Sequence, residues 1–472
     1  MNQNSSVTSY NRRYLVLAAM MLSGIMGPID ASIVNVTLPT IAGYFKVDVA
    51  LAQWVPMIYL LTISSLLLFY GRLGDIFGYK KIYLAGLAGF TIASALCGLS
   101  PTIQWLIAFR AVQGLAAGMM MAVPYAIITA SFPPEERGKA MGINAMSISI
   151  GLATGPSLGG FITASLGWHF VFFINIPVGI AGLLWANHVV PDIKGQRSKV
   201  DIFGAATAFI TLFCFLLFVN RFQRYGLSYT TGILLVIAAF SFISFIRIEA
   251  RVKQPMLNLS LFANRTFSFA NISALLNFMS QYVMVFVTPF FLQRVLIYSP
   301  GYVGLLMTAF PLAVMVAAPF SGSLSDRIGT RILACIGASL CTVSLIFMST
   351  LPLSAGPADI IWRLALFGLG TGIFQSPNNS TVMGSVPKSC LGISSGVLAT
   401  TRNVGMVLGI ATAGAVMYAF APPYVLEKAN LEAADTLVFL TGLRYAYLAG
   451  AILTGTAALT SLVKADIKHA SN

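Results

Sequence analysis

The chain alternates between long apolar blocks and short segments that contain charged residues, prolines or glycines. A membrane-spanning helix needs about 20 mostly apolar residues. Fourteen blocks meet this requirement, at residues 14–36, 53–70, 82–99, 103–129, 139–164, 168–188, 202–220, 229–247, 266–292, 301–322, 332–350, 360–383, 392–420 and 442–463. The pattern therefore predicts an all-α integral membrane protein with 14 transmembrane helices.

The composition argues against the main soluble classes. Of the 472 residues, 57% are hydrophobic and 9% are charged, whereas soluble domains carry about 25% charged residues. Because so few charges cannot cover a soluble surface, a soluble enzyme, a secreted disulfide scaffold and a nucleic-acid binder are improbable. The five cysteines have no metal-ligand spacing, and we interpret them as small core residues.

The basic residues indicate the orientation of the chain. The net charge is +14, and Lys and Arg concentrate in alternate loops. With the N-terminus inside, the cytoplasmic segments hold 19 of them and the opposite loops hold 5. Because cytoplasmic loops are enriched in Lys and Arg, we expect a multi-pass protein of the plasma (inner) membrane. Both termini are then cytoplasmic, and the lipid bilayer surrounds the helices.

Two segments of the chain repeat one another. Residues 71–80 resemble residues 322–331 at an offset of 251. Further pairs keep nearly the same offset, namely Arg110 and Arg363, Pro124 and Pro377, and Gly155 and Gly409. We therefore predict two pseudo-symmetric six-helix halves, at 1–190 and 256–472, with an inserted helix pair at 191–255. Such repeats are typical of transporters whose two halves rock around a central site.

Asp30 is the only acid well inside a predicted span. Burying a carboxylate in a bilayer is costly unless it is neutralised, paired or wetted, so Asp30 is a candidate proton carrier. The alternative is an acid near a frayed helix end that water reaches from the outer interface.

Arg110 lies early in the fourth block, and Gln113 follows one helical turn later. An arginine beside a carboxylate stabilises its charge and can exchange partners with a substrate. We therefore pair Arg110 with Asp30 in proton coupling. The alternative is a structural arginine that is bonded to backbone carbonyls.

The fifth block contains a motif of small residues, which are Gly151, Gly155, Pro156, Gly159 and Gly160. Glycines spaced four residues apart let a neighbouring helix approach closely, and a proline can kink the backbone. Generic packing of membrane helices is the alternative interpretation.

The first copy of the repeat is predicted to form a gating loop on the cytoplasmic side. Its residues are Gly71, Arg72, Gly74, Asp75, Gly78 and Lys80, and the second copy supplies Asp326. Because helix N-termini carry positive partial charge, we expect Asp75 to receive the start of a helix from the other half, near residues 389–392. A solvated hairpin is the alternative, and the recurrence at Asp326 argues against it.

Polar residues within the apolar blocks are expected to line a substrate cavity. They are Asn35, Tyr59, Gln113, Tyr125, Asn277, Gln281, Gln375, Asn378, Asn379 and Arg402. For Arg402 the alternative is a side chain that extends to the inner interface. Methionines would add an adaptable apolar wall, so we expect apolar substrates that are neutral or singly positive.

The sequence shows no sign of a bound cofactor. There is no Walker lysine motif, so ATP is not expected to drive the protein directly. The three histidines lie near span ends or in the C-terminal tail, so no metal centre is predicted.

Several of these segments resemble signature motifs of the major facilitator superfamily. The resemblance rests on residues 71–80, 110–118 and 151–160. Residues 30–39 and 168–177 are similar to those of its fourteen-helix drug:proton antiporters. His169 stands where an arginine is common in that group, and residues 301–322 lack the acid of some polycation exporters, which argues against dicationic substrates.

The resemblance implies a secondary active exporter and not an enzyme. The protein would exchange protons for amphipathic small molecules such as drugs, dyes and toxic compounds, with the proton gradient as its driving force. Asp30 would be the protonation site, Arg110 its coupling partner, residues 151–160 the outer-side closure and Asp75 the inner gate. A dedicated metabolite or siderophore exporter on the same scaffold is the alternative. A host with an outer membrane would add a periplasmic adaptor as a possible partner.

Overall fold

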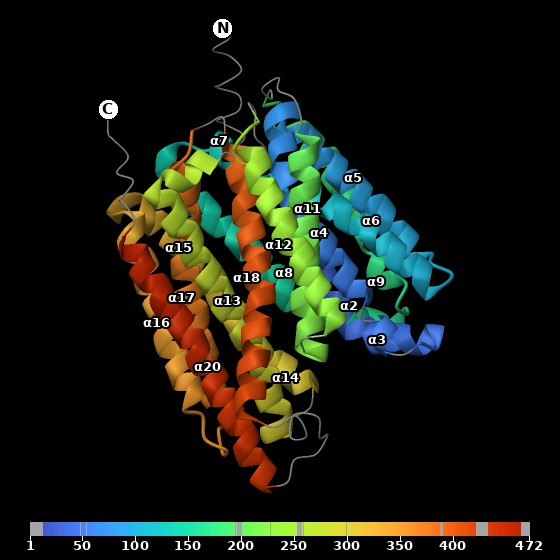
Figure 1. Cartoon of the computed structure of the whole chain (residues 1–472), viewed down its shortest axis with the longest axis vertical. Helices are drawn as coiled ribbons and strands as arrows, with labels where there is room; N and C mark the ends of the chain where they lie inside the picture. The colour runs from blue at the N-terminus through green and yellow to red at the C-terminus, as the bar shows by residue number, and fades with distance from the viewer. Residues whose placement is uncertain are drawn as a thin grey trace.

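The computed structural model describes residues 13–47, 49–52, 54–193, 195, 201–226, 228–252, 257, 259–298, 300–387, 390–421 and 433–463. Throughout this part of the chain the regular elements are helices, and no strand occurs in it (Figure 1). The prediction of an all-helical protein is therefore confirmed.

The N-terminal helices come first in the chain. They are α2 (Arg13–Phe45), α3 (Val49–Ala52), α4 (Trp54–Phe77), α5 (Tyr79–Gly98), α6 (Ile103–Ala122), α7 (Pro124–Ser131), α8 (Arg137–Ser165), α9 (Phe170–Phe173) and α10 (Asn175–Val189). Two helices follow, α11 (Ile202–Tyr225) and α12 (Tyr229–Glu249).

The C-terminal helices make up the rest of the described chain. They are α13 (Arg265–Phe290), α14 (Pro300–Met307), α15 (Ala309–Ile328), α16 (Thr330–Ser349), α17 (Pro357–Gly384), α18 (Leu391–Phe420) and α20 (Ala433–Leu462). Short 3-10 turns η1 (Pro134–Glu136) and η2 (Leu259–Ala263) precede α8 and α13, and a π-turn, η3 (Phe291–Val295), follows α13.

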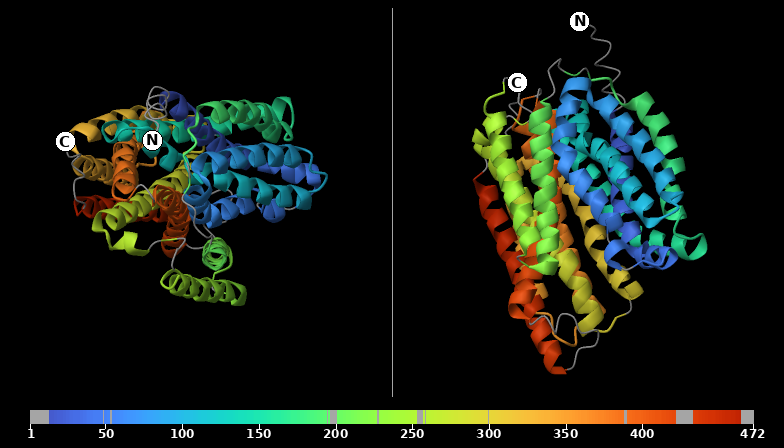
Figure 2. Two further views of the ribbon diagram at one scale, coloured as in Figure 1. Left: turned by 90° about the horizontal axis from the view of Figure 1, so that it is seen from above. Right: turned by 45° about the vertical axis from the view of Figure 1, so that its right-hand side comes forward.

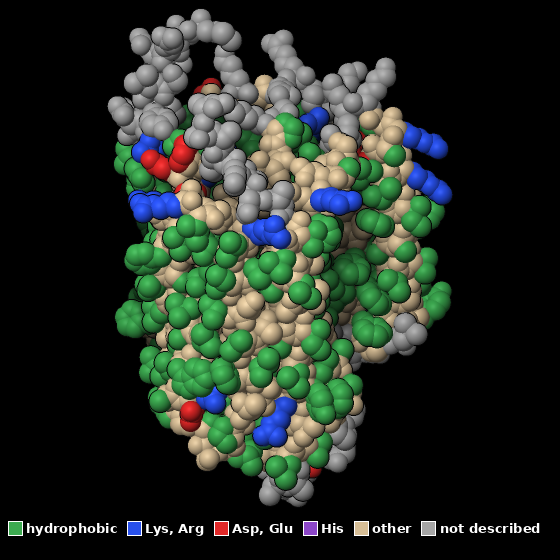
Figure 3. All heavy atoms as spheres, turned by 90° about the vertical axis from the view of Figure 1, so that its left-hand side faces the viewer, with side chains coloured by type: hydrophobic (Ala, Val, Ile, Leu, Met, Phe, Trp, Pro, Cys, Tyr) green, Lys and Arg blue, Asp and Glu red, His purple; other side chains and the backbone are tan. Residues whose placement is uncertain are grey.

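Twelve helical stretches in the described residues are long and apolar enough to cross a membrane. Helices α8 and α18 are not among them, although they are 29 and 30 residues long. Figure 3 shows an apolar belt on one face of the molecule, with charged side chains toward its two ends.

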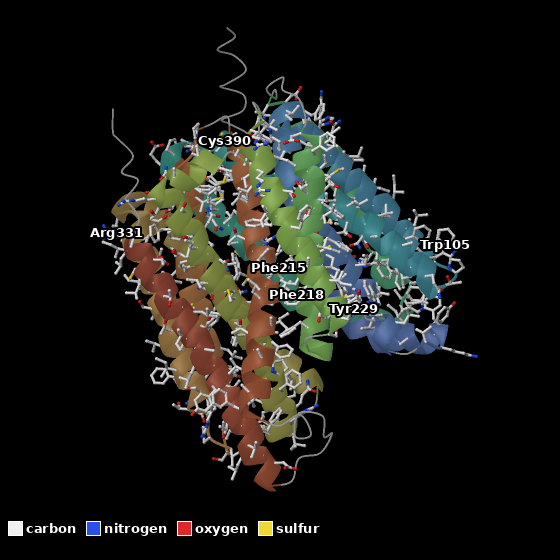
Figure 4. The ribbon with its side chains drawn as sticks, viewed as in Figure 1. Trp105, Phe215, Phe218, Tyr229, Arg331 and Cys390 are labelled. Atoms are coloured by element: carbon white, nitrogen blue, oxygen red, sulfur yellow. The ribbon has the colours of Figure 1, made fainter. Side chains whose placement is uncertain are left out.

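The N-terminal and C-terminal helices form two groups that lie side by side. Helices α11 and α12 pack against each other outside both groups (Figure 2, left). Helix α11 also contacts α4 and α18, one helix from each group. In Figure 4 its Phe215 and Phe218 lie close to α18.

The two groups meet mainly through α8 against α15 and α17, and through α4 against α18. These contacts concentrate at one end of the bundle, which we call the contact end. It contains the starts of α8 and α18, and Cys390, next to the start of α18, lies at this end in Figure 4, away from Tyr229. Toward the opposite end the ribbons of the two groups diverge (Figure 2, right).

The ends of the described chain also lie at the contact end. Arg13, at the start of α2, forms an ion pair of 2.9 Å with Glu136, next to the start of α8. Near the end of α20, Thr460 lies 2.8 Å from Ser273, in the first turns of α13. The first and last described helices therefore begin and end on the same side of the bundle.

Two details differ from the sequence prediction. The predicted block 103–129 is interrupted at Val123, because Pro124 begins a new helix, α7. Residues 71–77 form the last turns of α4 and not a loop. The turn itself falls on Gly78, whose φ of 95° is accessible to glycine without strain, and Gly329 repeats it with a φ of 95° after α15.

Candidate functional site

Asp30 lies near the middle of α2 and has 0% solvent exposure. Its carboxylate accepts three side-chain hydrogen bonds. Arg110 Nη1 donates at 2.6 Å, Gln113 Nε2 at 3.1 Å and Asn175 Nδ2 at 3.0 Å. These donors come from α6 and α10, so the site lies inside the N-terminal group. We call Asp30, Arg110, Gln113 and Asn175 the Asp30 cluster.

Arg110 is also fully buried and connects this cluster to α4. Its Nη1 donates to Gln113 Oε1 at 2.5 Å, and its Nε donates to the carbonyl oxygen of Val55 at 3.3 Å. The guanidinium carbon lies 4.0 Å from the centre of the Tyr59 ring, a distance suited to a cation–π contact. The Nη2 atom is buried and has no hydrogen-bond partner. Arg110 therefore balances the charge of Asp30 and keeps unused donor capacity.

Two members of this environment were not assigned from the sequence. Asn175 lies in the segment 168–177 that carried the family resemblance, but it was given no role. Ser94 on α5 accepts a hydrogen bond from Gln113 Nε2 at 2.8 Å and lies 3.4 Å from Asn175 Nδ2. An asparagine within a strongly apolar block was the available signal for Asn175, since buried polar groups in a membrane need partners.

Asp75 reaches the start of α18 at the contact end, as the sequence analysis expected. The backbone N–H of Gly392 donates to Asp75 Oδ1 at 2.8 Å, and that of Ile393 donates to Oδ2 at 3.0 Å. The Tyr79 hydroxyl also donates to Oδ1 at 2.7 Å. A carboxylate in this position uses free N–H groups and the positive end of the helix dipole.

Asp326 makes the equivalent contact in the opposite sense, from the C-terminal group to the start of a helix in the N-terminal group. It lies in the last turn of α15 and accepts hydrogen bonds from the N–H groups of Gly138 at 3.0 Å and Lys139 at 3.2 Å, at the start of α8. Each group therefore supplies one aspartate and one helix start to the contact end. The solvated-hairpin alternative does not describe either aspartate.

The remaining residues of the 71–80 segment support this contact. Gly71 lies against the backbone of Gly392, so that any larger residue would collide with it. A Cβ on Gly74 would come within 2.9 Å of Tyr79 and Val123. Lys80 Nζ donates to the carbonyl oxygen of Asn187 at 2.6 Å. Arg72 is partly buried.

The glycine motif of α8 packs against α2. Gly151 lies against Ile25 and Pro28, Gly155 against Ser32, and Gly159 against Ile33. A Cβ on Gly160 would meet no neighbour within 4 Å, so this glycine faces open space. Helix α8 continues through Pro156, whose side chain is outside the described residues.

The structure distributes the predicted cavity residues over several places. Tyr59 and Gln113 surround Asp30. Asn277 and Asn378 are fully buried among the C-terminal helices, where Asn277 lies near Cys341 and Asn378 Nδ2 donates to the carbonyl oxygen of Ala270. Each of these four residues packs within its own helix group, Tyr59 and Gln113 in the N-terminal group and Asn277 and Asn378 in the C-terminal group. In this conformation they do not line a space between the groups.

The other predicted cavity residues differ from one another in burial and in contacts. Gln375 Nε2 donates to Gln281 Oε1 at 3.2 Å, which joins α17 to α13. Tyr125 and Asn379 are buried, and Arg402 is partly buried. The side chain of Asn35 is outside the described residues.

Comparison with known proteins agrees with this geometry. The model of the Major Facilitator Superfamily matches residues 20–410 and, in a second match, residues 270–468. The chain belongs to the major facilitator superfamily. The all-helical architecture with two neighbouring helix groups is therefore that of a membrane transporter of this superfamily.

Individual superfamily relatives differ in their named substrates. The riboflavin transporter RibZ of Clostridioides difficile is 34% identical over 404 residues, which cover 85% of this chain and 87% of RibZ. The multidrug resistance protein Stp of Mycobacterium tuberculosis is 32% identical over 410 residues, 86% of this chain and 76% of Stp. The solved proton:xylose symporter XylE has the same fold, with a TM-score of 0.64, 14% identity, and 96% and 95% of the two chains covered.

Proposed function

We propose that the protein is a secondary active exporter that exchanges protons for amphipathic small molecules across the plasma (inner) membrane. In this proposal it has 14 spans, because α8 and α18 are long enough to cross the bilayer and pack against spanning helices. Helices α11 and α12 are then the pair inserted between two six-helix halves. The multidrug name of the relative Stp supports export of this substrate class.

The orientation of the proposal follows from charge. The 19-to-5 distribution of Lys and Arg supports a cytoplasmic position of the contact end. Both termini are then cytoplasmic. The two groups are closed against each other on the cytoplasmic side and diverge on the outer side, which corresponds to the outward-facing state of a rocking transporter.

The buried pair of Asp30 and Arg110 is the single observation that carries proton coupling. Both side chains have 0% exposure, and the acid accepts its hydrogen bonds from donors within one helix group. Protonation of Asp30 would leave the Arg110 charge uncompensated in a dry site, at a cost of about 3–5 kcal/mol for a broken buried pair. The cluster therefore has to rearrange when the proton binds.

Helix α4 provides the route by which this rearrangement would reach the contact end. Arg110 holds α4 through the Val55 carbonyl and the Tyr59 ring. Further along the same helix, Gly71 and Asp75 contact the start of α18. A change at Arg110 would shift a rigid helix that also closes the cytoplasmic side, and this relation links proton binding to alternating access.

The test uses purified protein in proteoliposomes with an imposed pH gradient and a panel of fluorescent dyes. Asp30→Asn should insert, fold and bind dye, because the amide has the size of the acid, but gradient-driven export should be lost. His169→Gln is the matched control, since it changes a titratable group outside the Asp30 cluster, and it should export at the wild-type rate. Export by Asp30→Asn at the wild-type rate would contradict proton coupling through this residue.

A dedicated metabolite exporter is the second candidate, and the riboflavin transporter RibZ is the relative that favours it. Both candidates need Asp30, so the mutation does not separate them. A competition experiment does. If several unrelated dyes inhibit one another's export, the broad exporter is supported, whereas transport of riboflavin alone supports the dedicated one.

A further inference from the structure

Arg402 on α18 is partly buried and differs from Arg110 and Arg363, the buried arginines of the described helices. Arg110 is paired with Asp30, and Arg363 forms an ion pair of 3.2 Å with Asp359 and donates to two backbone carbonyls. None of the ion pairs in the described part of the chain involves Arg402. An arginine inside a membrane protein is costly unless it has a partner or meets water.

The depth of Arg402 argues against a side chain that simply extends to the cytoplasmic interface. It lies ten residues beyond Gly392, about 15 Å further along the helix. Ser395 lies two turns before Arg402 on the same face of α18. Its hydroxyl donates to the carbonyl oxygen of Ala122, in the N-terminal group. The closed contact end therefore lies between Arg402 and the cytoplasm on that face.

The neighbours of Arg402 place it where α18 meets α13. Gly405 lies against Phe278, and Gly409, two turns beyond Arg402 on the same face, lies against the backbone of Met279. Tyr282 follows one turn later on α13. Both Arg402 and Tyr282 are only partly buried. Since Ser395, on the same face of α18, contacts the N-terminal group, Arg402 lies on a face of α18 that is turned toward that group.

The acids of the helices do not offset this positive charge. Asp30 is enclosed by its own cluster with Arg110, and Asp75 and Asp326 are bonded to helix starts at the contact end. Among Arg110, Arg363 and Arg402, Arg402 is thus the one whose charge is not paired with an acid in the described part of the chain. A guanidinium binds carboxylates and other oxyanions through paired N–H donors.

We infer that Arg402 recognises the negative charge of the substrate, so the preferred substrates are amphipathic molecules that carry an anionic group. The inference rests on the proposed function and names its substrate class. It replaces the expectation of neutral or singly positive substrates, because Asp30, the acid that would attract a positive charge, is enclosed by its own cluster. In this arrangement Asp30 binds the proton and Arg402 binds the substrate.

The test compares two dyes with similar fused-ring systems and opposite charge, fluorescein and rhodamine 123. Binding to purified protein is measured by fluorescence polarisation in wild type, Arg402→Gln, Arg402→Lys and Arg444→Gln. Arg444 is an exposed arginine of α20 and serves as the matched control. Loss of a charged hydrogen-bond partner should raise the Kd of fluorescein about tenfold or more in Arg402→Gln. Arg402→Lys should retain part of the affinity, and Arg444→Gln should match wild type.

The affinity for rhodamine 123 decides whether the effect is one of charge. It should stay unchanged or increase in Arg402→Gln. An equal loss for both dyes, no loss for fluorescein, or wild-type binding of rhodamine 123 alone would overturn the inference while the export proposal stands. Failure of the proposed function can also be distinguished from failure of this inference. If wild type exports neither dye under a pH gradient, the proposed function fails for these substrates, whereas fluorescein binding that depends on Arg402 would still support the anion site.

Discussion

The contact between Asp75 and the start of α18 allows a quantitative test of how the cytoplasmic side is held closed. Replacing Asp75 by Asn keeps the size of the side chain and removes its charge. The amide oxygen can still accept from Gly392 or Ile393, but the amide NH2 group then faces the other N–H donor. We therefore expect the closed state to be destabilised without unfolding of α4.

The magnitude follows from the two hydrogen bonds of 2.8 and 3.0 Å. A charge at a partly buried helix terminus contributes up to about 2 kcal/mol, and a hydrogen bond to a charged group exceeds a neutral one by about 1 kcal/mol. A loss of about 1–2 kcal/mol changes the ratio of closed to open molecules by roughly 5–30-fold. Asp326→Asn should act in the same direction, because Asp326 makes the mirrored contact with Gly138 and Lys139.

The assay is a distance measurement by electron paramagnetic resonance in a background without the five native cysteines. Spin labels at Lys81→Cys and Ile332→Cys report on the first turns of α5 and α16, at the exposed surface of the contact end. Asp75→Asn should add a population at longer distance. Asp359→Asn is the control, since its pair with Arg363 is partly exposed and lies within one helix.

The reasoning fails if the distance distribution is unchanged in Asp75→Asn, in Asp326→Asn and in the double variant. A shift in only one single variant would show that the two contacts do not hold the closed state equally. A shift of the same size in Asp359→Asn would show that any loss of acidic charge opens this end, and the specific role of the helix starts would be refuted.

Two further predictions concern positions where packing decides the outcome. Asn175→Ala removes one of the two amide donors to Asp30 Oδ1, so it should lower the stability in detergent by about 2 kcal/mol and reduce gradient-driven export, as measured by thermal unfolding and dye efflux. Gly142→Ala should weaken the closed state by about 1–3 kcal/mol, because its Cβ would collide with the backbone carbonyl of Ala318 across the contact end. Gly160→Ala, where the Cβ meets open space, should leave the spin-label distances unchanged.

The sequence was sufficient to predict the helical class and the pairing of a few chemically unusual residues. Asp30 and Arg110 stand out because charges are rare inside apolar blocks, and they form an ion pair of 2.6 Å. Asp75 was correctly matched with the start of a helix near residue 392, because its repeat at Asp326 marked it as more than a surface acid. An isolated charge within an apolar block, such as Asp30, has few possible partners.

The sequence did not show which neutral polar residues face a cavity and which are buried within one helix group. Gln113 and Asn277 were expected in a cavity, yet each is fully buried within one helix group. In a soluble helix the polar face marks the side away from the core, but helices in a membrane are apolar toward lipid and toward one another. Periodicity therefore does not tell which face meets the other group. For the same reason, Asn175 was not recognised as a partner of Asp30.

The separation of proton and substrate groups has a consequence for coupling. Asp30 lies inside the N-terminal group and has no exposure, while Arg402 lies on α18 in the C-terminal group. In the proposed mechanism the two therefore cannot compete for one ligand by direct contact. The connection has to pass through α4, which touches Arg110 at Tyr59 and touches the start of α18 at Asp75. Proton and substrate then influence each other because both bias the same helix contact, as linkage between two sites requires.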